Sequence, residues 1–125
     1  MITEQLQLYR DTTKFAEYLM HMNNTMCRQV RYNIWGDVLK SSCELIDCIY
    51  VANTYVDRRE ESLTRYLVML GGIKTRLRLL HEGRYTSPRQ NTHLMQIAEG
   101  CSRQATAWKN SVRKSSSVNP CERRQ

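Results

Sequence analysis

Residues Glu60 to Gly83 read EESLTRYLVMLGGIKTRLRLLHEG, and their apolar side chains recur at steps of three and four. At 3.6 residues per turn, this spacing places the apolar side chains along one side of a helix. That side consists of Leu63, Tyr66, Leu67, Leu70, Ile73, Leu77 and Leu80. The stretch therefore predicts an amphipathic helix that buries one face in a core.

The same helix carries arginines along a different line. Arg58, Arg65 and Arg76 follow one another at spacings of seven and eleven residues, so each points within about 20° of the first around the helix axis. Gly71 and Gly72 lie between Arg65 and Arg76, and each mid-helix glycine costs about 1 kcal/mol relative to alanine. We expect close approach of another helix at this glycine pair.

Three further stretches show the same helical period, at about residues 5–26, 33–56 and 88–113. Ser87-Pro88-Arg89-Gln90 has the pattern of a capping box with proline at the first helical position. Gly83 suits the left-handed position that follows the end of a helix. Helices joined by such short connections predict an all-α fold, an antiparallel up-down-up-down four-helix bundle over residues 1–114. Residues 115–125, SSSVNPCERRQ, lack an apolar period and predict a disordered basic tail.

No apolar run reaches the roughly 18 to 20 residues that span a bilayer, and the first residues lack the basic and apolar regions of a signal peptide. The sequence therefore predicts a cytoplasmic protein. The cysteines are odd in number and contain neither a CxxC pair nor a zinc-type spacing with histidine. We expect reduced thiols, no metal site and no cofactor. The cysteines are Cys27, Cys43, Cys48, Cys101 and Cys121.

Charge is distributed unevenly along the chain. The formal net charge is +7, yet residues 1–57 hold five Lys or Arg against seven Asp or Glu, giving −2, and residues 58–125 hold fourteen against five, giving +9. Such asymmetry favours a polyanionic partner, and nucleic acid is the natural one because no lipid-binding amphipathic segment is present. The alternative is a basic surface that only keeps a small bundle in solution.

The sequence contains no pattern typical of catalysis. Paired carboxylates in an apolar setting, a nucleophile with a histidine, a metal cluster and a phosphate-binding glycine loop are all missing, and Gly71-Gly72 is not followed by the Lys-Ser/Thr of a P-loop. We therefore predict that the protein is not an enzyme. Arginines that hold phosphates through paired hydrogen bonds are the remaining chemistry.

Several motifs resemble a known family. They are Arg31-Tyr-Asn-Ile-Trp-Gly-Asp37, Arg78-Leu-Leu-His-Glu82, the polar start of the last helix, and Arg103-Gln-Ala-Thr-Ala-Trp108. Together they resemble the accessory variability determinant (Avd) proteins of diversity-generating retroelements over about residues 8–114. This family is similar to the ribosomal-RNA intervening-sequence proteins, which have the same four-helix fold and are an alternative assignment.

The Avd resemblance implies a homopentamer of basic four-helix bundles that binds nucleic acid, RNA or DNA, and associates with the retroelement's reverse transcriptase. It implies an accessory role in mutagenic retrohoming without catalysis. A structural protein-protein adaptor whose charge is incidental is the alternative from a different class. The candidate nucleic-acid-binding residues are Arg58, Arg65, Arg76, Arg78, Arg103, Lys109 and Arg113, of which Arg78 is included on the family motif.

A contact between subunits is predicted on the outward side of the helix at residues 60–83. Val68 and Leu79 are eleven residues apart on one line of that helix, close in direction to the glycine pair. A second apolar line on a helix that already faces its own core suggests an oligomer. Isolated exposed apolar residues are the simpler explanation. The candidate interface residues are Val68, Gly71, Gly72 and Leu79.

Overall fold

A computed structural model describes the backbone of residues 3–124 and the side chains of residues 6–115. The chain is all-helical, as predicted, with no strand in the described residues. Four helices are long and one is a single turn: α1 (Thr3–Met22), α2 (Arg28–Arg31), α3 (Ile34–Thr54), α4 (Arg59–Glu82) and α5 (Pro88–Arg124). Short 3-10 turns at Asn23–Thr25 and Val56–Arg58 lie in the connections before α2 and α4.

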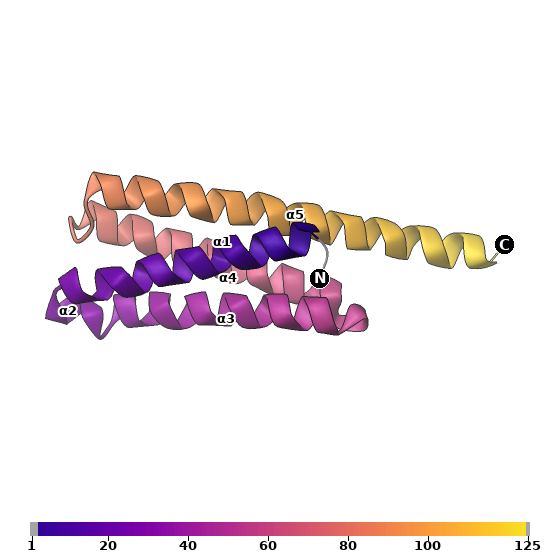
Figure 1. Cartoon of the computed structure of the whole chain (residues 1–125), viewed down its shortest axis with the longest axis horizontal. Helices are drawn as coiled ribbons and strands as arrows, with labels where there is room; N and C mark the ends of the chain where they lie inside the picture. The colour runs from indigo at the N-terminus through magenta and orange to yellow at the C-terminus, as the bar shows by residue number, and fades with distance from the viewer. Residues whose placement is uncertain (1–2, 125) are drawn as a thin grey trace.

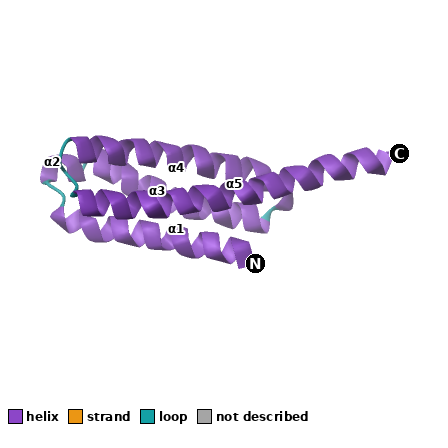
Figure 2. Cartoon of the chain, turned by 90° about the horizontal axis from the view of Figure 1, so that it is seen from above, coloured by secondary structure: helices purple, strands orange, loops and turns teal. Residues whose placement is uncertain are grey.

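The four long helices lie side by side along the long axis of the molecule (Figure 1). Each contacts two neighbours, because α1 packs on α3 and α5, and α4 packs on α3 and α5. The α3–α4 connection lies at one end of the molecule, and the connections on either side of it lie at the other. Helix α5 continues past this group of helices at its carboxyl end (Figure 2).

The predicted apolar line of α4 forms part of the core. Six of its seven members are at most 2% exposed, and Leu67 is partly buried at the edge. The other long helices contribute apolar positions at the same spacing, with Phe15, Trp35 and Leu94 fully buried. Each large apolar side chain buried in this way contributes about 1.5 to 3 kcal/mol. The helical period of the sequence therefore gives the core correctly.

One polar contact joins three helices inside the core. Thr12 Oγ1 of α1 and the Tyr66 hydroxyl of α4 lie 2.6 Å apart and share a hydrogen bond, and Thr12 also donates to Cys101 Sγ of α5 at 3.8 Å. Burial raises the pKa of the Tyr66 hydroxyl and that of the Cys101 thiol above their ordinary values. Both groups therefore stay protonated and neutral at physiological pH.

The end of α4 differs from the prediction for Gly83. The amide of Tyr85 bonds to the Leu80 carbonyl and the amide of Arg84 to the His81 carbonyl, which is the Schellman arrangement. Its left-handed residue is Arg84, with φ of 66°, whereas Gly83 has φ of −80°. A Cβ at Gly83 would lie 2.9 Å from the exposed Tyr85 ring, so a larger residue there would displace that side chain. An arginine in the left-handed position costs about 1 kcal/mol relative to glycine.

The predicted capping box at the start of α5 is confirmed. The Gln90 amide donates to Ser87 Oγ at 3.1 Å, and the Ser87 amide donates to Gln90 Oε1 at 2.9 Å. Pro88 occupies the first helical position, where its missing N–H removes no helical hydrogen bond. This short local pattern is sufficient to fix where the helix begins.

We predicted a disordered tail at residues 115–125, and the structure has helical backbone as far as Arg124. The side chains from residue 116 onward lie outside the described residues, so the division between bundle and tail at residue 114 stays a prediction. Within the described residues, none of the helices combines the length and apolar character that crossing a membrane requires.

Candidate nucleic-acid interface

The two sides of the helix group carry opposite charge. Among residues 6–115, α1 and α3 hold three basic and five acidic side chains, whereas α4 and α5 hold ten basic and four acidic ones. Because α1 packs on α3 and α4 packs on α5, the charge asymmetry of the sequence becomes an asymmetry in space. A polyanion would be attracted to the α4–α5 side.

Two ion pairs cross between α4 and α5. Lys74 Nζ lies 3.3 Å from Glu99 Oε2, and Arg113 Nε lies 3.1 Å from Glu60 Oε2. Both pairs mark the line along which these helices meet at the surface, which we call the α4–α5 seam. Each pair joins one basic group to one acidic group. Outside these two pairs, basic side chains on α4 and α5 still outnumber acidic ones.

Four of the seven predicted binding residues belong to the α4–α5 seam. Arg78 lies one helical turn beyond Lys74, Arg103 one turn beyond Glu99, and Lys109 one turn before Arg113. Arg78, Arg103 and Arg113 are exposed, and Lys109 is half-buried. Arg78, Arg103 and Lys109 can therefore approach phosphates along one edge of the molecule, and Arg113 can do so by exchanging its exposed ion pair with Glu60.

The other three predicted residues lie toward α3. Arg65 lines a cavity of about 110 Å³ together with Glu44 and Asp47 of α3. Arg76 Nη1 donates to the Gly72 carbonyl of its own helix at 3.1 Å. Arg58, in the turn before α4, holds its guanidinium 5.7 Å from the centre of the Tyr55 ring.

The predicted set therefore does not form one surface. Arg76 and Arg78 are two residues apart, which is a rotation of about 200° around a helix, so they point to opposite edges of α4. The α3–α4 edge holds Arg58, Arg65 and Arg76, with the carboxylates of α3 beside Arg65. The α4–α5 seam is the better candidate interface because its positive groups lie on two basic helices.

Arg59 is a structural arginine that the sequence analysis missed. Its guanidinium donates to the carbonyls of Ala52 at 2.6 Å and Asn53 at 3.4 Å, at the end of α3. It also lies 5.8 Å from the centre of the Trp108 ring of α5. Arg59 thus connects three helices at one end, and these contacts make its guanidinium less available to a phosphate.

The predicted oligomer residues are exposed and lack neighbours within the chain. Val68 is 71% exposed and Leu79 is 54% exposed. A Cβ added at Gly71 would meet no atom within 4 Å, and at Gly72 it would meet only Arg76 Nη1 at 3.1 Å. Among the described residues, no other helix makes the close approach expected at the glycine pair, so that expectation is not met within this part of the chain.

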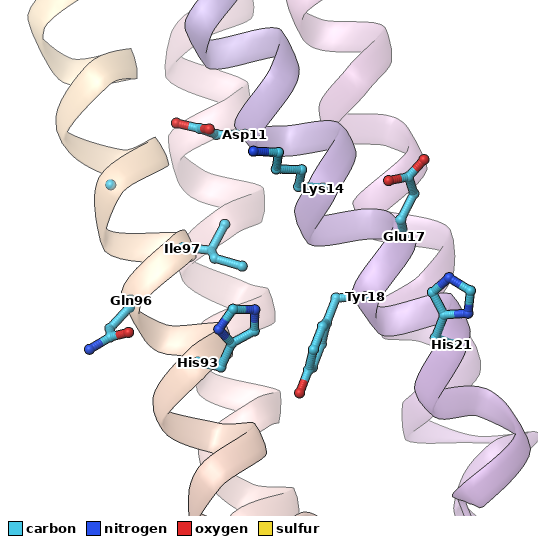
Figure 3. A pocket seen from close by; sticks show the side chains of 9 residues that line it. Asp11, Lys14, Glu17, Tyr18, His21, His93, Gln96 and Ile97 are labelled. Atoms are coloured by element: carbon cyan, nitrogen blue, oxygen red, sulfur yellow. The ribbon is translucent and has the colours of Figure 1, made fainter.

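A groove between α1 and α5 was not foreseen from the sequence. It has a volume of about 570 Å³, and the Tyr18 and His93 rings meet across it with their centres 4.5 Å apart. Tyr18 stands between His93 and His21 (Figure 3), so the two imidazoles do not converge on a common point. Among the described residues, no serine or cysteine lines this groove, and no group of His, Cys, Asp and Glu is arranged to hold a metal ion.

Comparison with known proteins gives no assignment. No protein-family model matches the chain, and no curated protein matches it either. The Avd resemblance, the absence of catalysis and the site residues therefore stay predictions. The placement of charge on α4 and α5 is what the structure adds to them.

Proposed function

We propose that the protein is a non-catalytic nucleic-acid-binding protein whose α4–α5 seam holds the phosphate backbone of RNA or DNA. The observation that carries the proposal is the gathering of positive charge on two adjacent helices, with Arg78, Arg103, Lys109 and Arg113 along one seam. Guanidinium groups bind phosphates through paired hydrogen bonds, and such contacts carry no sequence information. Binding should accordingly be strong at low salt and indifferent to base sequence.

The proposal includes the arrangement of the helices. We take the chain to be an antiparallel up-down-up-down four-helix bundle, supported by the ring of contacts among α1, α3, α4 and α5 and by the connections at alternating ends. In this arrangement α4 and α5 run in opposite directions beside each other. The basic residues then extend along most of one side instead of gathering at one end.

The biological setting of the proposal rests on the sequence resemblance. An Avd-like protein would act in the cytoplasm as an accessory to the reverse transcriptase of a diversity-generating retroelement, as a homopentamer. A reverse-transcriptase gene beside near-identical template and variable repeats would support this setting over the ribosomal-RNA intervening-sequence alternative. The exposed line of Val68, Gly71 and Leu79 is the surface on which subunits would meet.

A salt series tests the binding proposal. The affinity for a labelled oligonucleotide should fall by about 0.7 to 0.9 log units per log unit of salt for each phosphate neutralised. Changing Arg78, Arg103 and Arg113 to glutamine should lower the affinity and flatten this slope by up to about three counterions' worth. The matched control changes Arg58, Arg65 and Arg76 to glutamine, which removes the same charge from the other edge of α4.

The two triple variants separate the outcomes. A larger loss in the seam variant supports the α4–α5 seam, whereas a larger loss in the control would place the interface on the α3–α4 edge. An affinity that does not respond to salt in the unchanged protein would contradict nucleic-acid binding. That result would favour a protein-protein adaptor with incidental charge.

A further inference from the structure

The turn between α4 and α5 lines an open cavity of about 740 Å³, whose lining residues run from His81 to Pro88 without Gly83. It lies at the end of the molecule where α5 begins (Figure 1). The proposed function does not use this cavity, because none of the four seam residues lines it. Its lining contains a hydroxyl, an imidazole and a guanidinium close together in the sequence.

Two polar atoms of this lining are buried without a partner. Thr86 is only 6% exposed, and its Oγ1 makes no hydrogen bond within the described structure. His81 Nδ1 is likewise buried and unbonded. A buried polar group without a partner is unfavourable, and of the seven such side-chain atoms in the described residues, two line this one cavity. Two of them on one cavity indicate that a ligand completes their hydrogen bonds.

Arg84, which lines the same cavity, is held in the left-handed conformation that glycine adopts without penalty. The Schellman hydrogen bonds there are made by backbone groups, so the fold itself requires no arginine at this position. Residues in a strained conformation persist where the side chain has another role. The guanidinium of Arg84 is therefore the group that this position presents to the cavity.

The first turn of α5 adds to the positive potential. Ser87 and Pro88 line the cavity, and the N-terminal end of a long helix carries a partial positive charge. The capping box satisfies the amides of Ser87 and Gln90, while the described structure gives the Arg89 amide no partner. An anion at this helix end is favoured by these groups together.

Two features oppose an anion. The carboxylate of Glu82 lines the cavity, and the carboxyl end of α4 carries a partial negative charge. However, the α4 carbonyls at this end are already bonded by the amides of Gly83, Arg84 and Tyr85. Glu82 and Arg84 are both exposed to solvent, so screening weakens their charges alike. The Thr86 hydroxyl and the start of α5 are the groups that favour an anion beyond this balance.

We propose that the α4–α5 turn binds a phosphate group, with Arg84 pairing with its charge and the Thr86 hydroxyl donating to one of its oxygens. The phosphate belongs either to the bound nucleic-acid strand or to a small phosphorylated molecule. In the first case the turn site deepens the proposed function and rests on it. The chemistry recognised at the turn is the same in both.

The test compares two variants that keep the fold. Arg84→Gly removes the left-handed strain and should raise the melting temperature by about 4 °C. Thr86→Val removes a hydroxyl that has no partner, so it should leave stability equal or higher. Each variant should weaken binding of inorganic phosphate by about tenfold, measured by NMR titration at constant ionic strength. Arg10→Gln, on the exposed face of α1, removes one positive charge elsewhere and should bind phosphate unchanged.

The outcomes are distinct. Phosphate binding by Arg84→Gly equal to that of the unchanged protein would overturn the proposal, and so would shifted amide signals confined to residues outside 81–90. If a 5′-phosphorylated single strand also binds the two turn variants more weakly, the phosphate belongs to the strand. If only inorganic phosphate and a mononucleotide are affected, the ligand is a small molecule. An unchanged protein that binds phosphate but no oligonucleotide would contradict the proposed function and leave the turn site standing.

Discussion

The α1–α3 side and the α4–α5 side of the protein bury similar apolar surfaces but expose opposite charges. Both sides contribute fully buried large side chains, such as Leu45 from α3 and Leu70 from α4. Their outer faces differ, with an acidic excess on one side and a basic excess on the other. The comparison separates the two faces of a helix, since packing determines the inner face and leaves the charge of the outer face free to differ between the sides.

Departures from the most stable choice occur on both sides. On the α4–α5 side, Arg84 occupies a position suited to glycine, Gly71 lies mid-helix with free space around it, and Thr86 buries an unbonded hydroxyl in the turn. On the α1–α3 side, Thr13 Oγ1 and Trp35 Nε1 are buried without a partner. We therefore expect stabilising substitutions on both sides.

The largest effect on stability should come from shortening a core leucine, and it should be equal on the two sides. Leu45→Ala and Leu70→Ala each remove a side chain that is at most 1% exposed, and each should lower the free energy of unfolding by about 2 to 5 kcal/mol. Urea denaturation measures both. A cost at one position several times that at the other would show that the two sides do not share one equally packed core.

Arg59 is an exception on the basic side, because it is a basic residue of α4 with a structural role. Arg59→Ala should cost about 1.5 to 3 kcal/mol, since it removes hydrogen bonds to the Ala52 and Asn53 carbonyls and the contact with Trp108. Its neighbour Arg58 is exposed and makes one ring contact, so Arg58→Ala is the matched control with little effect. Equal melting temperatures for the two variants would contradict this assignment.

Alkaline pH should lower the free energy of unfolding through Tyr66, whose hydroxyl joins the two sides. Below about pH 10, the ordinary pKa of tyrosine, Tyr66 is protonated in both the folded and unfolded chain. Above it the unfolded chain loses the proton while the folded chain keeps it, so stability falls by about 1.4 kcal/mol per pH unit. Tyr66→Phe lacks this contribution, and its unfolding free energy measured above pH 10 should fall less steeply. Parallel curves for the two proteins would rule out Tyr66 as the cause.

The smallest effect concerns the glycine pair. Gly71→Ala should raise the free energy of unfolding of the isolated chain by about 1 kcal/mol, because a Cβ at this position meets no atom. If a second molecule packs closely there, the same change should shift light scattering toward smaller species. Gly71→Leu should do so more strongly. An isolated chain of about 15 kDa before any substitution would contradict the predicted oligomer.

Features that depend on local sequence were predictable. The core line of α4 follows from a period of 3.6 residues, and the start of α5 follows from the spacing of Ser87 and Gln90. These patterns need no knowledge of distant residues. The same holds for the all-α class.

Features that depend on contacts between distant residues were not predictable. One local feature was missed as well, because the left-handed position after α4 falls on Arg84 and not on Gly83. The role of Arg59 depends on Trp108, far away in the chain. The opposite directions of Arg76 and Arg78 follow from their spacing, but only the structure shows which helix lies beside each edge, with α3 beside Arg65 and α5 beside Lys74.

The contact of Thr12 with Tyr66 also determines how the helices can slide. A shift of α1 along α4 by one turn, about 5.4 Å, would keep apolar residues opposite each other but separate these two hydroxyl groups. Each would then be buried without a partner, at a cost of about 1 to 3 kcal/mol per group. Apolar packing alone distinguishes poorly between such registers, so this hydrogen bond, with that of Gln104 to Asp11 between α5 and α1, favours one register. The positions of the outer charges relative to one another are therefore set from inside the core.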